Sequence, residues 1–344
     1  MLHTSVKPYK TAKKCKKIRR REKIWKKTRR NDVSRLKKTR LRCKLLKYVC
    51  VFSRDIPGAD AASSNIHHKH GPEMSHYLFD GMDSYDTPES NRSSLAFHLW
   101  LHSRWYFYQS NFWTFILSGN TASHGKLGKE EQIMYSSRNI RLIERCGGRI
   151  HIRGLNHLRD LGGKPVVIVG NHMSLLETAV LHAIIREHID FSFVVKKSLL
   201  DVPFFRHILL SFHAIPVSRT NAREDLRTVL TEGKKMLESG ISMIVFPQST
   251  RTDTFDPSQF NTIGIKLAKS AGVPVLPMAL KTDFLSTGKY LRDLGPLHPE
   301  RPVRFEFGPP MEVAQNSHET HQKTIEFIQG CFNRWADEDK VAER

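Results

Sequence analysis

Short apolar runs recur through the second half of the chain, and longer segments with helical periodicity separate many of them. The runs with the length and composition of buried strands are residues 149–152, 165–169, 191–195, 214–217, 242–246, 274–280 and 303–307. Between residues 223 and 238 one helical face collects Leu226, Val229, Leu230, Gly233 and Leu237. Further helices are expected over residues 178–185 and 318–335. Strands alternating with helices predict an α/β fold whose sheet is largely parallel or mixed and is covered by helices.

An aromatic segment precedes this pattern, over residues 95–117. It holds Trp100, Trp105 and Trp113, three of the five tryptophans of the chain. Rings with polar tips favour the interface between a bilayer and water, and interspersed residues such as His98 and Arg104 oppose a span through the bilayer. We therefore predict an amphipathic helical segment at residues 92–125 that lies in a membrane interface. A helix that packs its aromatic face onto the α/β domain is the alternative, and the two interpretations are compatible.

The positive charge of the chain is concentrated at its start. The net charge is +21, yet residues 1–54 hold 22 Lys and Arg against two acidic residues, which leaves 33 basic and 32 acidic residues for positions 55–344. Mutual repulsion opposes compact folding of such a tail, so we expect disorder and attraction to phosphate-rich surfaces. Residues 55–91 lack periodicity and are expected to form a linker, and residues 126–340 form the α/β domain. Met74 and Met82 are alternative starts, which would make the tail non-native.

Neither a metal site, a disulfide framework nor a membrane span is indicated. The five cysteines are scattered without a C-x-x-C pair, and no histidine cluster has the spacing of metal ligands. No apolar run reaches the roughly 18 residues typical of a transmembrane helix, and the basic start lacks the apolar core of a secretory signal. We expect a reducing cytoplasmic location, with no metal and no bound cofactor.

The first candidate site follows the apolar run 165–169 and reads Gly-Asn-His-Met-Ser-Leu-Leu-Glu over residues 170–177. Ligands of open α/β sheets bind at the carboxyl ends of strands, where His172 lies, and an imidazole is suited to taking a proton at neutral pH. Glu177 can reach back to the ring, fix its tautomer and stabilise the imidazolium. Ser174 and Glu177 also fit a capping box, so Glu177 is alternatively a helix cap.

Two polar loops and one apolar run follow this site. Residues 214–220 bring Arg219 to a strand end, and a guanidinium can bind phosphate through paired donors. Residues 244–251 end a buried strand at Pro247 and present a loop suited to an anionic headgroup, made of Gln248, Ser249, Thr250 and Arg251. Residues 273–278, Val-Pro-Val-Leu-Pro-Met, indicate only a buried strand.

In this order and spacing, the four blocks resemble the glycerolipid acyltransferase family typified by lysophosphatidic acid acyltransferases. The family pattern is Asn-His-x4-Asp, an apolar stretch ending in Arg, Phe-Pro-Glu-Gly-Thr-Arg, and Val-Pro-x-x-Pro. The resemblance covers about residues 149–308, and the aromatic segment is similar to the membrane-associated amino-terminal helices of that family. It implies that His172 is the general base and Glu177 its orienting carboxylate. The substrate site that it implies contains Asn171, Lys197, Arg219, Gln248, Ser249, Thr250 and Arg251, with Lys196 a near-equal candidate for the role of Lys197.

The resemblance implies an O-acyltransferase that moves a fatty acyl chain from acyl-CoA or acyl-acyl carrier protein to a lysophospholipid hydroxyl, as in 1-acylglycerol-3-phosphate. Such an enzyme would be peripheral or monotopic at the cytoplasmic face of a membrane. Direct transfer is expected because no Ser or Cys has a nucleophile-elbow context, and backbone N–H groups near the helix start would stabilise the oxyanion. Glu177 replaces the family Asp, Gln248 replaces Glu and Ser249 replaces Gly. We expect the last two changes to alter the acceptor site.

Two other functions fit the same residues. One is the same chemistry on a different lysolipid, and the other is a non-catalytic protein whose tail binds anionic lipid or RNA. Only Tyr9 and Trp25 supply aromatic rings before residue 48, so the tail offers nucleic acid little beyond phosphate contacts. Nucleic acid is therefore not an expected partner, whereas the bilayer, the lysophospholipid and the acyl donor are.

Overall fold

The computed structural model describes residues 77–248, 250–288, 291, 294–313 and 316–342. The basic tail at residues 1–54, most of the predicted linker and the predicted site residue Ser249 lie outside the described residues. All the elements below belong to the compact unit Met74–Arg344.

Strands and helices alternate over most of this unit. In chain order they are β1 (Ser84–Asp86), α2 (Leu95–Leu99), α3 (Arg104–Ser123), α4 (Lys129–Arg145), β2 (Ile150–Arg153), α5 (Leu155–Arg159), β3 (Val167–Gly170), α6 (Leu176–Ile185), β4 (Phe191–Lys196), the 3-10 turn η3 (Lys197–Asp201), α7 (Pro203–Ser211), β5 (Ile215–Val217), α8 (Ala222–Glu238), β6 (Ser242–Val245), η4 (Pro257–Gln259), α9 (Ile263–Ala271), β7 (Val275–Lys281), β8 (Val303–Phe307) and α10 (Ser317–Ala342). Each run predicted to be a strand forms one, with its ends shifted by two residues at most.

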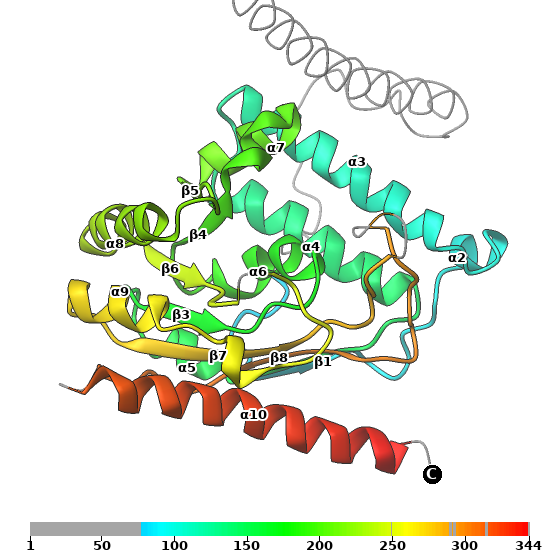
Figure 1. Ribbon diagram of the computed structural model, residues 1–344. Helices are drawn as coiled ribbons and strands as arrows, with labels where there is room; N and C mark the ends of the chain where they lie inside the picture. Colours follow the sequence, from blue (N-terminus) through cyan, green and yellow to red (C-terminus); the bar gives the residue numbers. More distant parts are fainter. Residues whose placement is uncertain (1–76, 249, 289–290, 292–293, 314–315, 343–344) are drawn as a thin grey trace, which may run out of the picture. The chain divides into compact units, whose positions relative to one another are not determined.

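The strands form one mixed sheet in the order β1-β2-β8-β7-β3-β6-β4-β5 (Figure 1). The five strands β7, β3, β6, β4 and β5 are parallel, whereas β8 pairs antiparallel with β7, and β1 with β2. The predicted α/β fold with a mixed sheet is thus confirmed. Because the five parallel strands share one direction, their carboxyl ends and the loops that follow them lie at one edge of the sheet.

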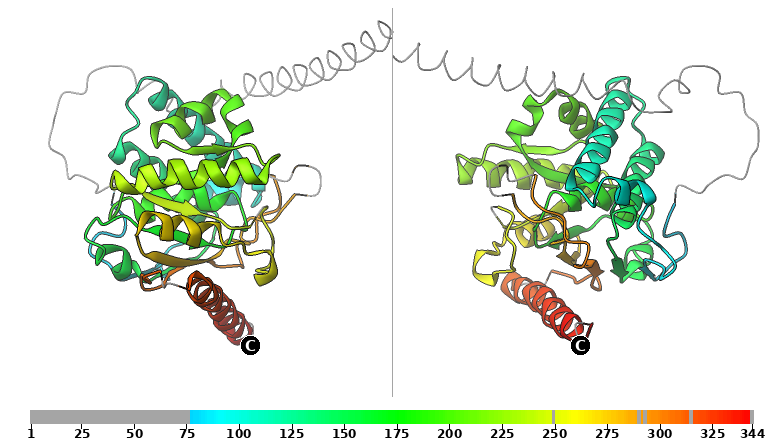
Figure 2. Two further views of the ribbon diagram at one scale, coloured as in Figure 1. Left: turned by 60° about the vertical axis from the view of Figure 1, so that its left-hand side comes forward. Right: turned by 90° about the vertical axis from the view of Figure 1, so that its right-hand side faces the viewer.

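Helices cover both faces of the sheet. The central strand β3 shows this, because its side chains alternate between two cores. Val166, just before β3, and Ile168 face a core built with α3, α4, α5, α6 and α7. Val167 and Val169 face a core on the other side, built with α8, α9 and α10. Burial on both faces explains why the central strands read as continuous apolar runs rather than as alternating ones. Helices α3 and α10 cover opposite faces of the sheet, and they lie well apart in both views of Figure 2.

Two parts of the fold differ from the expected organisation. The segment expected to be a linker contains β1, which pairs with β2, and Phe79 within it is fully buried. A three-residue strand is too short to show periodicity, so its pairing was not visible in the sequence. Helix α10 extends to Ala342 and is longer than the predicted span 318–335.

The aromatic segment forms two helices rather than one. Between α2 and α3, Leu101 and His102 adopt φ angles of 51° and 54°, in the left-handed region that interrupts a right-handed helix. Helix α3 buries Phe107 against the domain, whereas Trp105 is 51% exposed. The helix therefore packs on the domain and also presents aromatic rings outward. Among the described residues, no helix combines the length and the apolar character needed to cross a bilayer.

Candidate active site

The predicted base and its carboxylate meet where β3 leads into α6. His172 follows β3 by two residues, and its Nδ1 contacts Glu177 Oε2. The Glu177 side chain is fully buried, whereas the His172 side chain is 18% exposed. Since Nδ1 faces Glu177, Nε2 is the ring nitrogen left to meet a substrate. The pair has the arrangement in which a carboxylate fixes the tautomer of a histidine base.

The second oxygen of Glu177 anchors the turn that precedes α6. Glu177 Oε1 accepts hydrogen bonds from the backbone N–H groups of Met173 and Ser174, both at 2.8 Å, and from Thr282 Oγ1 at 2.7 Å. Ser174 Oγ in turn accepts from Leu176 N at 3.1 Å. The geometry is compatible with both interpretations of Glu177, because one oxygen contacts the histidine ring and the other accepts from N–H groups in the turn before α6.

The loop after β6 holds the backbone of His172. Gln248 Oε1 accepts from His172 N at 2.8 Å, and Thr252 N donates to His172 O at 3.1 Å. The amide of Gln248 also donates to Thr252 Oγ1 at 2.9 Å, and its side chain is buried. Phe246 stacks on the imidazole with ring centroids 4.6 Å apart and an interplanar angle of 14°. These contacts restrain the movement of His172, at its backbone and on one face of its ring.

Two residues assigned to the substrate by resemblance are turned inward instead. Asn171 is buried and exchanges two hydrogen bonds of 2.8 Å with the backbone of Leu280 on β7. Both polar atoms of the Gln248 side chain are hydrogen-bonded within the protein, the oxygen to His172 N and the nitrogen to Thr252 Oγ1. Both side chains therefore hold the turn that carries His172. The expectation that the change to Gln248 alters the acceptor site is not supported by this geometry.

The predicted basic residues lie in a row along the sheet edge. Arg251 follows β6, which neighbours β3; Lys196 and Lys197 end β4 and begin η3; and Arg219 follows the outermost strand β5. The strands that precede these residues are the first, second and third neighbours of β3 on one side, and with strands about 4.8 Å apart they lie roughly 5, 10 and 14 Å from β3. Arg219 itself is exposed and has a φ of 59°, with its backbone N–H donating to Asp225 Oδ2 at 2.7 Å.

Thr250 lies in the same loop as Arg251, and its Oγ1 donates to Arg251 O at 3.4 Å. Arg251 is partly exposed. Among the described residues, no cluster of three His, Cys, Asp or Glu side chains is placed to hold a metal ion.

Thr282 was not identified from the sequence. Its side chain is fully buried, its hydroxyl donates to Glu177 Oε1, and it accepts from Ser174 Oγ at 2.9 Å. The available signal was its place two residues after the predicted strand run 274–280, because a hydroxyl group at the end of this strand lies at the same edge as the base.

Exposed apolar side chains occur on α2, α3, η3 and α7 and on the residues that join them. They are Leu95, Leu99, Trp100, Leu101, Trp105, Phe112, Leu117, Leu199, Val202, Phe204 and Leu210. Helices α3 and α7 pack against each other closely enough for Gly119 to lie on the backbone of Phe204, and η3 begins directly after β4, at the edge described above.

The middle part of the chain is similar in sequence to known acyltransferases. Residues 149–281 match the family model described as Acyltransferase. The 1-acyl-sn-glycerol-3-phosphate acyltransferase of Pseudomonas aeruginosa is 34% identical over 134 residues, which are 39% of this chain and 50% of that protein. The enzyme of the same name from Borreliella burgdorferi is 30% identical over 115 residues, 33% of this chain and 45% of that protein. The chain thus spans about half the length of the curated relatives that it matches.

A solved structure shares the fold. The crystal structure of the 1-acyl-sn-glycerophosphate acyltransferase PlsC from Thermotoga maritima superposes with a TM-score of 0.54 at 18% identity. The match covers 70% of this chain and 97% of that one.

Proposed function

We propose that residues 149–281, which match the Acyltransferase family model, form a glycerolipid acyltransferase domain, and that the chain transfers a fatty acyl group from a thioester to the hydroxyl of a lysophospholipid such as 1-acylglycerol-3-phosphate. The observation that carries this proposal is the contact of His172 Nδ1 with the buried carboxylate of Glu177, at the sheet edge where the basic residues also lie. An intact pair of this kind argues against a catalytically silent binding domain.

In the proposed reaction, His172 Nε2 takes the proton of the acceptor hydroxyl as that oxygen attacks the thioester carbonyl carbon. The resulting imidazolium is stabilised by Glu177 and by the face of the Phe246 ring. When the tetrahedral intermediate collapses, the carbon–sulfur bond breaks, and the thiolate takes the proton from His172. The products are an ester and a free thiol, and His172 returns to its neutral form.

The backbone N–H groups expected to stabilise the oxyanion are partly occupied. Near the start of α6, those of Met173 and Ser174 donate to Glu177, and that of Leu176 donates to Ser174. The developing negative charge would therefore be met by other N–H groups near the start of α6 or by other donors around His172.

Arg251 is the strongest candidate for the acceptor phosphate. It follows the strand next to β3, and its loop is tied to the backbone of His172 through Gln248 and Thr252. A phosphate on the glycerol carbon adjacent to the reacting hydroxyl lies within a few ångströms of it, which favours a residue from the loop after β6, the neighbour of β3, over one that follows the outermost strand β5. Lys197, Lys196 and Arg219 then add positive charge farther along the edge.

The membrane supplies the acceptor in this proposal. The exposed apolar side chains on α2, α3, η3 and α7 would enter the interfacial layer of a bilayer, and η3 begins at Lys197 on the active-site edge. A peripheral position of this kind would let a lysophospholipid reach His172 without leaving the lipid surface. The acyl donor, coenzyme A or acyl carrier protein, is a co-substrate in this scheme.

The direct test is to incubate purified protein with a labelled acyl thioester and a panel of lysolipids, and to identify the acylated product. Acylation of 1-acylglycerol-3-phosphate in preference to lysolipids with larger headgroups is the expected result. His172→Ala should abolish product formation. Arg251→Ala should raise the KM for the acceptor and leave the KM for the donor nearly unchanged, because a lost phosphate contact weakens only acceptor binding. Transfer that persists in His172→Ala would refute the proposed base.

A further inference from the structure

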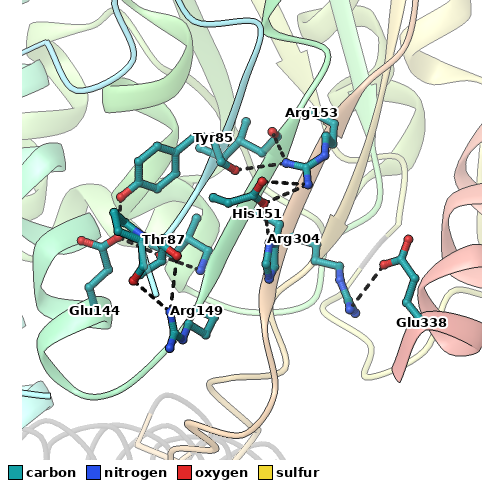
Figure 3. Close-up of polar contacts among 12 residues, drawn as sticks. Tyr85, Thr87, Glu144, Arg149, His151, Arg153, Arg304 and Glu338 are labelled. Atoms are coloured by element: carbon teal, nitrogen blue, oxygen red, sulfur yellow. Dashed lines mark hydrogen bonds and ion pairs between the residues drawn. The ribbon is translucent and has the colours of Figure 1, made fainter. Parts of the chain in front are cut away.

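A polar groove lies on another part of the sheet, between the strands β1, β2 and β8 and the helix α10 (Figure 3). Its volume is about 1020 Å³. None of the residues assigned to the acyl-transfer site lines it. The groove shares the sheet face with α10, whereas the aromatic helix α3 covers the opposite face.

Three nitrogen-bearing side chains come together in this groove because of the strand register. Arg149 and His151 are two residues apart along β2 and the residue before it, so they point to the same face. His151 is paired directly with Arg304 on the neighbouring strand β8. Neighbours in these relations have Cβ atoms within about 5 to 7 Å of each other. Figure 3 shows the ring of His151 between Arg149 and Arg304.

Arg304 has an unused donor in spite of its burial. The residue is only 7% exposed. Its Nη2 pairs with Asp339 Oδ1 at 2.7 Å and more loosely with Glu338 Oε2 at 3.5 Å, both on α10. Its Nη1 is buried and has no hydrogen-bond partner among the described residues. Buried guanidinium nitrogens are nearly always satisfied, so an unpaired one on a residue that lines a groove points to an acceptor that enters from outside.

The acidic groups in the groove are mostly committed to other partners. Asp86 lies 2.6 Å from His151 Nδ1 and 2.8 Å from Arg153 Nη2, which leaves His151 Nε2 for another contact. Burial pushes the pKa of Asp86 upward, but hydrogen bonds from His151 and Arg153 outweigh burial and hold it below the usual value. Arg149 Nη1 donates to the main-chain oxygens of Thr87 and Pro88, at 3.3 and 3.0 Å, rather than to a carboxylate. Glu306 is paired with Arg334.

We propose that this groove is a second anion site, which binds the phosphate group of a soluble compound through Arg304 Nη1, Arg149 and His151. A phosphate has enough oxygens to accept from all three side chains, and guanidinium groups match its geometry. A phospholipid headgroup carries the same chemistry. The soluble source is favoured because the groove opens on the sheet face opposite the apolar helix α3, which is the face suited to lipid.

Chemical footprinting of the full chain can test this site without interference from other anion-binding regions. A dicarbonyl reagent modifies accessible arginines, and peptide mass spectrometry reports Arg149 separately from Arg251 and from the basic tail. Inorganic phosphate is raised while chloride holds the ionic strength constant, and the concentration that half-protects Arg149 gives the dissociation constant. Saturable protection of Arg149 is the expected result.

Two variants test the geometry, and one serves as a control. Arg304→Lys keeps a cation for Asp339 but removes the vacant nitrogen, and His151→Ala removes a partly exposed donor, so at least one of them should fold normally. Each should weaken phosphate protection of Arg149 about tenfold or more, the worth of one charge-assisted hydrogen bond. Arg227→Gln, which changes an exposed arginine on α8, should leave protection unchanged.

Three outcomes would overturn the proposal. The first is that phosphate does not protect Arg149, and the second is that protection is equally strong in the folded Arg304→Lys and His151→Ala proteins. The third is protection by vesicles containing phosphatidic acid but not by inorganic phosphate, which would identify a lipid headgroup rather than a soluble ligand.

Discussion

Replacing Glu177 by Gln should remove the basicity of His172 while leaving the turn before α6 in place. The side-chain oxygen of the new residue has to stay where Oε1 is, because Met173 N, Ser174 N and Thr282 Oγ1 all donate to that position. The amide nitrogen then takes the position of Oε2, opposite His172 Nδ1. Two donors cannot face each other, so Nδ1 must become the acceptor and the proton must move to Nε2. A ring with Nε2 protonated cannot accept the proton of a substrate.

The expected loss can be bounded from known cases. General base catalysis contributes about a hundredfold to ten-thousandfold, and the same inversion of tautomer in a serine-protease triad costs about ten-thousandfold in kcat. Stability should change less. Three hydrogen bonds lose their charged acceptor, and each weakens by about 1 kcal/mol. The variant also avoids the desolvation penalty of a buried carboxylate, which is several kcal/mol and acts in the opposite direction.

The assay is kcat at saturating donor and acceptor, together with the free energy of unfolding in denaturant. Ser174→Ala is the matched control, because it removes the hydroxyl that accepts from Leu176 N and should cost about 1 kcal/mol of stability with kcat mostly intact. In a His172→Ala background, Glu177→Gln should add little further loss, since the two residues act as a unit. Full activity of Glu177→Gln would refute the dyad and leave Glu177 as a helix cap.

Other changes probe the surroundings of the dyad. Thr282→Val keeps the side-chain volume but removes the hydroxyl between Ser174 and Glu177, so kcat should fall and unfolding should become easier by about 1.5–3 kcal/mol, with the acceptor KM unchanged. Gln248→Glu should lower kcat without changing the ranking of lysolipid acceptors, because a carboxylate cannot donate to Thr252 Oγ1; a new acceptor preference would contradict the positioning role. Burial and nearby Asp80 raise the pKa of Glu187 to about 7. The folded protein therefore holds this proton more tightly than the unfolded chain, whose carboxyl has a pKa of about 4.3. The stability gained from the protonated carboxyl is complete below about pH 4.3 and is lost as pH rises through about 7. Glu187→Gln should remove this loss, and unfolding measured from pH 4 to pH 8 with the same slope in both proteins would exclude it.

The local pattern of the chain was sufficient for the main elements and for the dyad. Each predicted strand run is a strand because continuous apolar residues can be buried on both faces only inside a covered sheet. His172 and Glu177 are five residues apart, so the turn between β3 and α6 alone brings them into contact. The amphipathic face of residues 223–238 likewise predicted α8, where Val229, Gly233 and Leu237 are buried.

Contacts between distant segments were beyond the reach of such patterns. Asn171 and Gln248 look like substrate ligands in the sequence, yet they bond the backbones of Leu280 and His172 on neighbouring segments. Thr282 lies 105 positions from Glu177 and meets it only because β7 is placed beside β3. A side chain's partners across a sheet depend on strand order, which local periodicity does not encode.

The same distinction separates the two proposed anion sites. The row of basic residues near His172 follows from strand ends that the sequence marks clearly, because five parallel strands place every following loop at one edge. The groove with Arg149, His151 and Arg304 has no sequence motif, since it depends on the register between β2 and β8 and on where α10 crosses them. Apolar periodicity thus determined the elements and the turn that carries His172, whereas tertiary pairing decided which polar atoms are satisfied and which, such as Arg304 Nη1, have no partner among the described residues.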